Sequence, residues 1–178
     1  MTSKTVETIV RQWLEDVVIG LGFCPFAKPV VAAGKLKIIV SEADDPDTLI
    51  ADLDNALASL TDDGPDTIIV AVANLLQDFA DYNDFLDVAD ALIEARALVG
   101  VIQIASFHPD YRFANEPADA VSHYTNRAPY PLLHLLRESD VEQAIAQHPD
   151  ADGIPARNIA RLESLSSEDL ERLFAHRS

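Results

Sequence analysis

The segment from Ser106 to Arg137 gathers most of the side chains in this chain that could carry out chemistry. It holds three of the five histidines and three of the nine arginines, in a protein with 30 Asp and Glu residues against 13 Lys and Arg residues. Histidine exchanges protons near neutral pH, and arginine binds carboxylate or phosphate through paired hydrogen bonds. These residue types predict a site for a small anionic ligand. The candidates in the segment are His108, Asp110, Arg112, His123, Asn126, Arg127, Tyr130, His134 and Arg137.

His108 is the candidate general acid or base. It follows the apolar run 99–107 and precedes Pro109, which cannot continue a strand, so we expect it where a strand ends. Asp110 would then orient the imidazole. The alternative is structural: His108 caps the turn, and Asp110 forms a local turn with its own backbone.

Cys24 is the candidate nucleophile and the only cysteine of the chain. A thiol reacts as the thiolate, which a nearby imidazolium or guanidinium favours, and His108 or His123 could supply that charge. The alternative is a small buried apolar residue, since aromatic residues flank the cysteine in the motif Phe23-Cys24-Pro25-Phe26.

An arginine clamp is the predicted anion-binding element. Arg157 and Asn74 join the residues of the 106–137 segment as candidate ligand-binding residues. The alternative is that each arginine pairs with one of the many carboxylates. His108, Asp119, His123 and His134 lack the spacing of the standard metal motifs, so no metal is expected. No glycine-rich phosphate loop or dinucleotide fingerprint occurs, so no organic cofactor is expected either.

Apolar periodicity predicts the elements that must position these residues. Helical spacing covers 6–21, and Asp45-Pro46 marks the start of a second helix, because aspartate caps a helix and proline suits its first turn. Strands are expected at 36–40, 67–73 and 99–107, with a third helix over 85–93 capped by Asp81 or Asn83. This alternation predicts an α/β protein, one domain over residues 1–178, with a small, three- to four-stranded, mainly parallel sheet flanked by helices.

The carboxyl ends of parallel strands share one edge, where ligands collect in such sheets. Ser41, Glu42, Asn74, Ser106 and His108 are expected at that edge. In the second half of the chain, short helices are predicted at 131–137 and 141–148, and a fourth strand or a loop at 156–162. A terminal helix is expected to begin at Ser166 or Ser167.

Composition restricts the partners and the location of the protein. The net charge of −17 repels phosphate backbones, which argues against nucleic-acid binding. Apolar runs stay far below the roughly 20 residues that cross a bilayer. The first residues lack the pattern of a secretory signal, and one cysteine cannot form an internal disulfide. We therefore expect a cytoplasmic protein without a membrane partner.

Several long motifs resemble those of one known family. They are Gly20-Leu21-Gly22-Phe23-Cys24-Pro25-Phe26-Ala27, Phe107-His108-Pro109-Asp110-Tyr111-Arg112-Phe113, Ser122-His123-Tyr124-Thr125-Asn126-Arg127 and Pro129-Tyr130-Pro131. Over nearly its whole length the chain resembles the uncharacterised domain-of-unknown-function family fourteen-fifteen. The resemblance implies a bacterial single-domain protein and carries no established reaction, cofactor or catalytic residue.

Three functional hypotheses follow from the residues. The first is an enzyme that acts on a small anionic metabolite without an organic cofactor. The second is a module that binds a small anion or a protein partner without turnover. In the third, the polar cluster is a buried network that ties a long loop to the sheet, and His108→Ala chiefly lowers stability.

Overall fold

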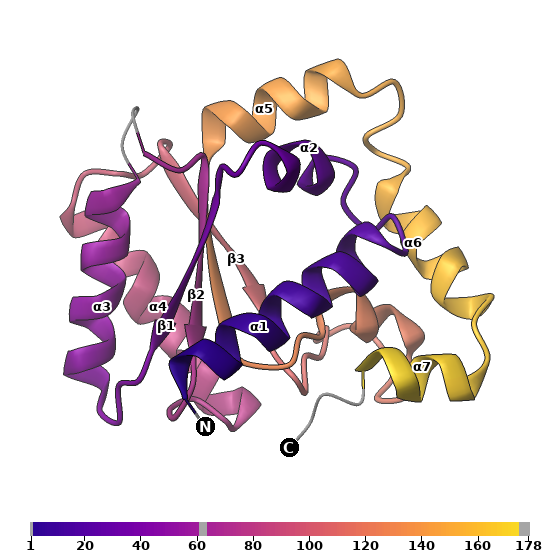
Figure 1. Cartoon of the computed structure of the whole chain (residues 1–178), viewed down its shortest axis with the longest axis horizontal. Coiled ribbons are helices and arrows are strands. Elements are labelled where there is room, and N and C mark those ends of the chain that lie inside the picture. The colour runs from indigo at the N-terminus through magenta and orange to yellow at the C-terminus, as the bar shows by residue number, and fades with distance from the viewer. Residues whose placement is uncertain (1, 61–63, 175–178) are drawn as a thin grey trace.

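A four-stranded mixed sheet forms the centre of the computed structural model, which describes residues 2–60 and 64–174 (Figure 1). The strands are β1 (Leu36–Ser41), β2 (Thr67–Val72), β3 (Ile102–Phe107) and β4 (Leu132–Arg137), in the order β1-β2-β4-β3. β1 and β2 are parallel, whereas β4 runs antiparallel to both β2 and β3. The predicted α/β class is confirmed, and the prediction of a mainly parallel sheet is wrong.

The error arises at 131–137, which was expected to be a short helix and contains β4. Leu132, Leu133 and Leu135 are fully buried, because the central position of the strand covers both of its faces. A short apolar run has no clear period, so burial on two faces decides between helix and strand. That burial depends on contacts with β2 and β3, which are distant in the sequence.

The expected edge of the sheet is nevertheless correct. β4 reverses direction relative to β2, and β3 reverses it again, so β1, β2 and β3 all point the same way. Their carboxyl ends therefore share one edge, which receives Glu42, Asn74 and His108.

One face of the sheet is covered by α3 (Pro46–Ser59) and α4 (Phe79–Ala95), which bury Ile68, Val70 and Leu133. The predicted cap of α3 is confirmed, since the Asp45 carboxylate accepts the Thr48 backbone N–H at 2.9 Å. The predicted cap of α4 is wrong. Asp78 caps it by accepting the Ala80 N–H at 2.8 Å, and the helix begins at Phe79, two residues before Asp81.

The other face packs against α1 (Ser3–Trp13) and its π-helical continuation η1 (Leu14–Ile19), which agree with the helix expected over 6–21. α1 crosses in front of the strands in Figure 1. Val10 and Trp13 contribute to this core together with Ile69 and Leu132 of the sheet. α2 (Ala27–Ala32) and α5 (Glu138–Gln147) lie above α1 in the same view.

The remaining elements are the 3-10 helix η2 (Val121–Asn126), α6 (Ile154–Glu163) and α7 (Ser167–Phe174). The strand or loop expected at 156–162 is wrong, because this segment lies within α6. Pro155 lies in the first turn of α6, where a backbone N–H has no helical partner, so it favours the helix start. The cap of α7 is confirmed, since Ser166 Oγ accepts the Asp169 N–H at 3.1 Å.

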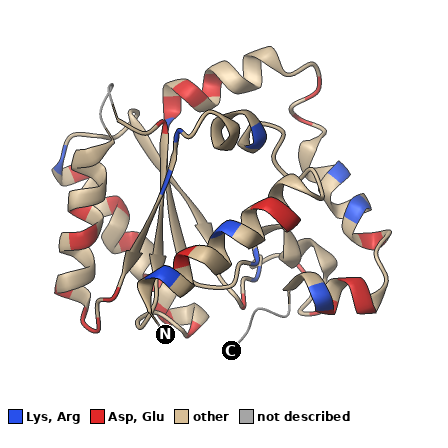
Figure 2. Ribbon diagram, in the orientation of Figure 1, with Lys and Arg blue, Asp and Glu red and all other residues tan. Residues whose placement is uncertain are grey.

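Acidic residues are distributed over the helices, and basic residues are scattered between them (Figure 2). Among the residues that the structure describes, no helix is both long and apolar enough to cross a membrane.

Candidate functional site

His108 is completely buried at the carboxyl edge of the sheet, beside the rings of Phe79 and Tyr82. Its Nδ1 accepts the backbone N–H of Asp110 at 3.0 Å, so this nitrogen carries no proton. Nε2 therefore carries the proton and donates to the Leu76 carbonyl at 3.1 Å. These two bonds join the loops after β2 and β3. The geometry favours the structural alternative, and proton transfer by His108 stays a prediction.

The hydrogen bond from His108 restrains an unusual backbone conformation at Leu76. Its φ of 59° lies in the left-handed region, which a branched side chain rarely adopts. Such a conformation persists only where the surroundings hold it, and the hydrogen bond from His108 to the Leu76 carbonyl is one such restraint.

His123 is used in the same way. It is 1% exposed, its Nδ1 accepts the Phe113 N–H at 3.2 Å, and its Nε2 lies 2.7 Å from the Pro117 carbonyl. The ring thus holds the 113–117 loop. The structure does not bring His108, His123 and Cys24 together through any direct contact that it resolves between described residues.

The predicted arginine clamp is dispersed. Arg137 pairs with Asp66 and Asp140, and Arg157 pairs with Asp150. The guanidinium of Arg127 stacks on the Tyr124 ring, 4.1 Å from its centroid, and Arg112 is exposed. Tyr130 is buried, and the Asn74 side chain donates to the Glu42 carbonyl at 3.0 Å. Anion binding by these residues stays a prediction.

Tyr82 is a residue of this edge that the sequence analysis did not single out. Its hydroxyl donates to the Leu132 carbonyl at 2.7 Å and accepts the Phe107 N–H at 3.1 Å, so it joins β4 to β3. Burial raises the pKa of Tyr82 far above its ordinary value. The spacing of apolar residues in α4 predicts that Tyr82 is buried in the core. No sequence signal predicts that its hydroxyl joins β4 to β3.

A cavity of about 480 Å³ lies on the sheet face that carries α1, and we call it the sheet-face cavity. Its floor includes Ile69, His134 and Ala105, which the strand register aligns across β2, β4 and β3. Its apolar walls come from η1, α2 and α5. They include Leu14, Val18, Phe26, Ala27, Val30, Val31, Val141 and Ala144.

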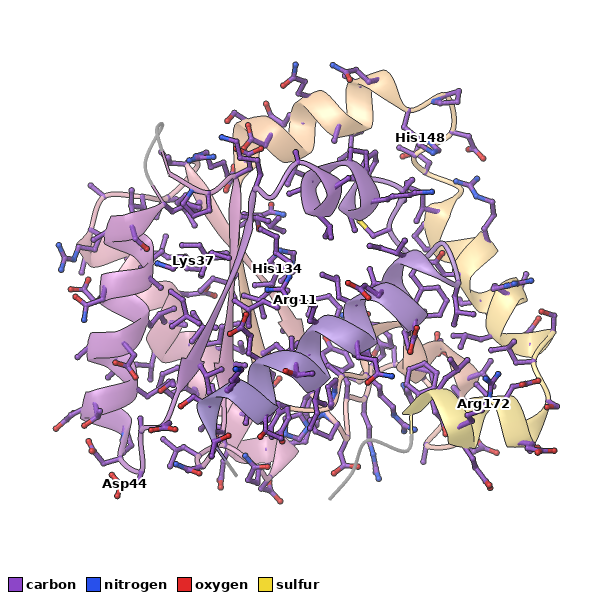
Figure 3. All side chains as sticks on the ribbon, viewed as in Figure 1. Arg11, Lys37, Asp44, His134, His148 and Arg172 are labelled. Carbon is purple, nitrogen blue, oxygen red and sulfur yellow. The ribbon has the colours of Figure 1, made fainter. Side chains whose placement is uncertain are left out.

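His134 is the central polar group of this floor, and Figure 3 shows it projecting from the sheet into the space bounded by α1 and α5. Thr67 Oγ1 lies 2.7 Å from the Leu135 carbonyl and 2.7 Å from His134 Nε2. The hydroxyl has one proton, which the carbonyl takes, so it accepts the Nε2–H. In the neutral ring, the lone pair therefore lies on Nδ1. Burial lowers the pKa of His134 to about 4.

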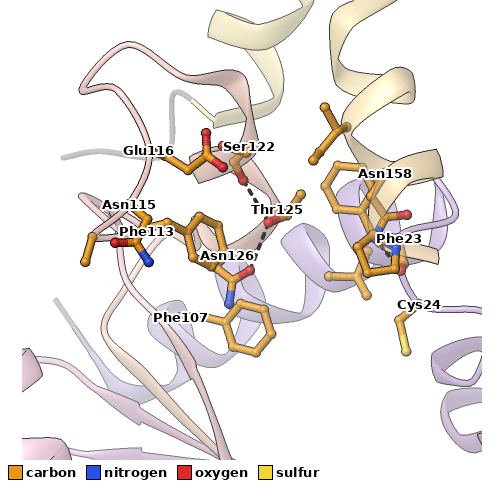
Figure 4. Close-up of a pocket in the computed structure, with 14 residues that line it drawn as sticks. Phe23, Cys24, Phe107, Phe113, Asn115, Glu116, Ser122, Thr125, Asn126 and Asn158 are labelled. Carbon is orange, nitrogen blue, oxygen red and sulfur yellow. Dashed lines mark hydrogen bonds between the residues drawn. The ribbon is translucent and has the colours of Figure 1, made fainter. Parts of the chain in front are cut away.

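A second cavity of about 620 Å³ lies between the 113–126 segment and α6, and we call it the amide cleft (Figure 4). Ser122, Thr125 and Asn126 stand on one wall, and Asn158 and Cys24 on the other. Its polar lining consists of the amides Asn115, Asn126 and Asn158, the hydroxyls of Ser122 and Thr125, the Cys24 thiol and Glu116. The apolar part consists of Val18, Phe23, Phe107, Phe113, Ala114, Pro155 and Ile159.

The family model described as "Protein of unknown function (DUF1415)" matches residues 5–172, nearly the whole chain. The chain belongs to this family. The match confirms the resemblance found in the motifs. Neither the curated proteins nor the solved structures contain a significant match to this DUF1415 protein.

Cys24 of this DUF1415 protein lines both cavities and is partly buried. Burial raises the pKa of the thiol, and the backbone N–H groups of Phe26 and Ala27 oppose that effect only in part. The lining of the amide cleft includes no histidine, lysine or arginine that would favour a thiolate. Within the described ranges, no group of three or more His, Cys, Asp and Glu side chains has the arrangement of a metal site.

We expect native Cys24 to react slowly with iodoacetamide at about pH 7.5, with a rate that keeps rising above the ordinary thiol pKa of about 8.5. The raised pKa leaves little thiolate at neutral pH. Mass spectrometry of the alkylated protein measures the rate, and urea-unfolded protein is the control. A fast reaction at about pH 6.5 that disappears in His134→Leu would instead establish an activated nucleophile.

Proposed function

We propose that this protein is a small-molecule-binding module whose sheet-face cavity holds a predominantly apolar ligand. The ligand donates one hydrogen bond to Nδ1 of His134. The observation that carries the proposal is a neutral histidine on the floor of a predominantly apolar cavity of about 480 Å³. That volume and a lining with few polar groups are typical of small-molecule sites.

His134 is not what a simple hydrophobic core requires at this position. Leu132 and Leu136 precede and follow it on the same face of β4, and apolar side chains neighbour it on β2 and β3. A lone pair that faces mostly apolar surroundings is stabilised when a donor meets it. His134 makes no hydrogen bond to the described residues besides the one with Thr67. A ligand with an N–H or O–H group supplies the matching donor.

The enzyme that acts on a small anionic metabolite is the competing hypothesis. Its proton carriers His108 and His123 are hydrogen-bonded through both ring nitrogens, and two of its arginines, Arg137 and Arg157, pair with carboxylates. Arg137 reaches the rim of the sheet-face cavity, but Asp66 and Asp140 lie there with it and offset its charge. These contacts favour an uncharged ligand over an anion and binding over turnover.

The test is a titration with N-phenylnaphthylamine, an uncharged apolar fluorophore with a single N–H donor. We expect it to bind wild-type protein and to lose about tenfold in affinity in His134→Leu, since one hydrogen bond is removed. Ala144→Trp, a substitution on α5 that fills the cavity from its outer wall, should abolish binding.

Gln147→Leu is the matched control, because Gln147 is exposed and lies outside the lining of the sheet-face cavity, so its loss should leave affinity unchanged. Circular dichroism verifies that each variant is folded. Equal affinity in wild type and Ala144→Trp would overturn the proposal.

A further inference from the structure

We infer that the amide cleft and the sheet-face cavity form one bipartite site for an elongated amphiphile. The apolar tail occupies the sheet-face cavity, and a head group that donates hydrogen bonds, such as an alcohol or an amine, occupies the amide cleft. The inference rests on the proposed function for the tail and extends it to the class of ligand.

The two cavities are adjacent. Val18, Cys24 and Phe107 line both of them, so these three residues form the partition. The partition is thin because it consists of single residues from η1, from the connection to α2 and from the end of β3. Trp13 packs against Phe107 edge to face at 5.5 Å and holds that ring in place. A chain that passes this partition reaches both cavities.

The polar wall of the amide cleft has a surplus of acceptors. Thr125 Oγ1 lies 2.8 Å from the Ser122 carbonyl and 2.9 Å from Asn126 Oδ1, yet a hydroxyl has one proton for these two acceptors. The Asn126 amide cannot reverse, because its Nδ2 donates to the Ser106 carbonyl at 3.1 Å. The Ser122 carbonyl belongs to the 3-10 helix η2 and does not depend on this hydroxyl alone, so Asn126 Oδ1 is the acceptor that the wall presents to a donor in the cleft.

Ser122 is the second, independent indication. It is 8% exposed, and its Oγ is buried without a hydrogen bond to any described residue. A buried hydroxyl is costly to leave unpaired, and Ser122 lines the cleft, so a rotation of its side chain towards a polar group there would stabilise the hydroxyl. On the opposite wall, Asn158 donates to the Phe23 carbonyl at 2.9 Å, which fixes its amide and leaves its oxygen as a further acceptor.

Charge selects the head group. Glu116 is the acidic residue of the lining, and the residues that line the cleft include no Lys, Arg or His. An anionic head would meet a carboxylate and acceptor oxygens, whereas a hydroxyl or an ammonium group would donate to them. The cleft therefore favours a neutral or cationic amphiphile, the opposite of the anion that the histidines and arginines of the sequence predict.

Three ligands of equal chain length separate these alternatives. Decanol, decylamine and decanoate are each titrated below their aggregation concentrations, and each displaces N-phenylnaphthylamine from the wild-type protein. We expect decanol and decylamine to bind at least about tenfold more tightly than decanoate. Equal binding of all three would overturn the inference.

Variants of the cleft test the head group directly. Ser122→Ala should weaken the binding of decanol about tenfold and leave the binding of N-phenylnaphthylamine unaffected, because the fluorophore lies in the other cavity.

Glu116→Gln should weaken the binding of decylamine and leave that of decanol unchanged, with Glu142→Gln on the exposed surface of α5 as the matched control. If decanol binding is insensitive to Ser122→Ala while the fluorophore still requires His134, the bipartite site is excluded and the proposed function stands. If the fluorophore itself does not bind, the proposed function fails first.

Discussion

His108→Ala is expected to lower the free energy of unfolding by about 3 kcal/mol. The substitution removes a fully buried ring that lies 5.3 Å from the Phe79 ring centroid and 5.1 Å from that of Tyr82. It also leaves the Asp110 N–H and the Leu76 carbonyl without the partner that the ring supplies. Urea unfolding followed by far-ultraviolet circular dichroism measures the change.

Two conservative variants separate the contributions of the ring nitrogens. His108→Asn keeps an acceptor near the position of Nδ1, and His108→Gln keeps a donor near the position of Nε2, so each should lose less stability than His108→Ala. A surface control is Gln147→Ala, since Gln147 is exposed. If His108→Ala were as stable as the wild type, the anchoring role would be wrong and the proton-transfer hypothesis would gain support.

The second large effect is a dependence of stability on pH that originates at His134. Its pKa in the folded protein is lowered to about 4 from an ordinary value near 6.5, because burial disfavours the charged ring. The unfolded chain therefore binds more protons than the folded one between these two values. Stability from this group is complete above about pH 6.5 and is lost as the pH falls towards 4.

The expected loss from His134 is about 2 kcal/mol between pH 7 and pH 5. Carboxylates also titrate in acid, so the quantity to compare is the difference between wild type and His134→Leu at each pH. Urea unfolding of both proteins at about pH 7 and about pH 5 measures this difference in stability. A His134→Leu protein that loses as much stability as wild type over this range would show that His134 is not buried as a neutral ring.

Local signals predicted the elements that depend on neighbouring residues. The Asp45-Pro46 start of α3 was predicted correctly because both effects act within one helical turn. β2 was predicted from its β-branched run, and all of its residues are buried. The shared edge of β1, β2 and β3 also followed from the alternation of strands and helices.

Long-range contacts decided what the sequence analysis missed. The segment 132–137 became a strand because two cores bury it, and Tyr82 became a bridge because the ends of β3 and β4 meet its hydroxyl. The role of His134 depends on its alignment with Ile69 and Ala105 across three strands. Spacing along the chain contains no information about these pairings.

The sequence by itself determined the family, the α/β class and the edge of the sheet at which β1, β2 and β3 end. Those properties depend on motifs, periodicity and local capping. Only the tertiary structure decided which polar groups face a cavity and which hold the backbone. His108 and His123 have both ring nitrogens engaged, whereas His134 lines a cavity with one nitrogen bonded to Thr67. The physical reason is that a hydrogen-bond partner is set by distance in space, and a histidine in the sequence does not reveal its partner.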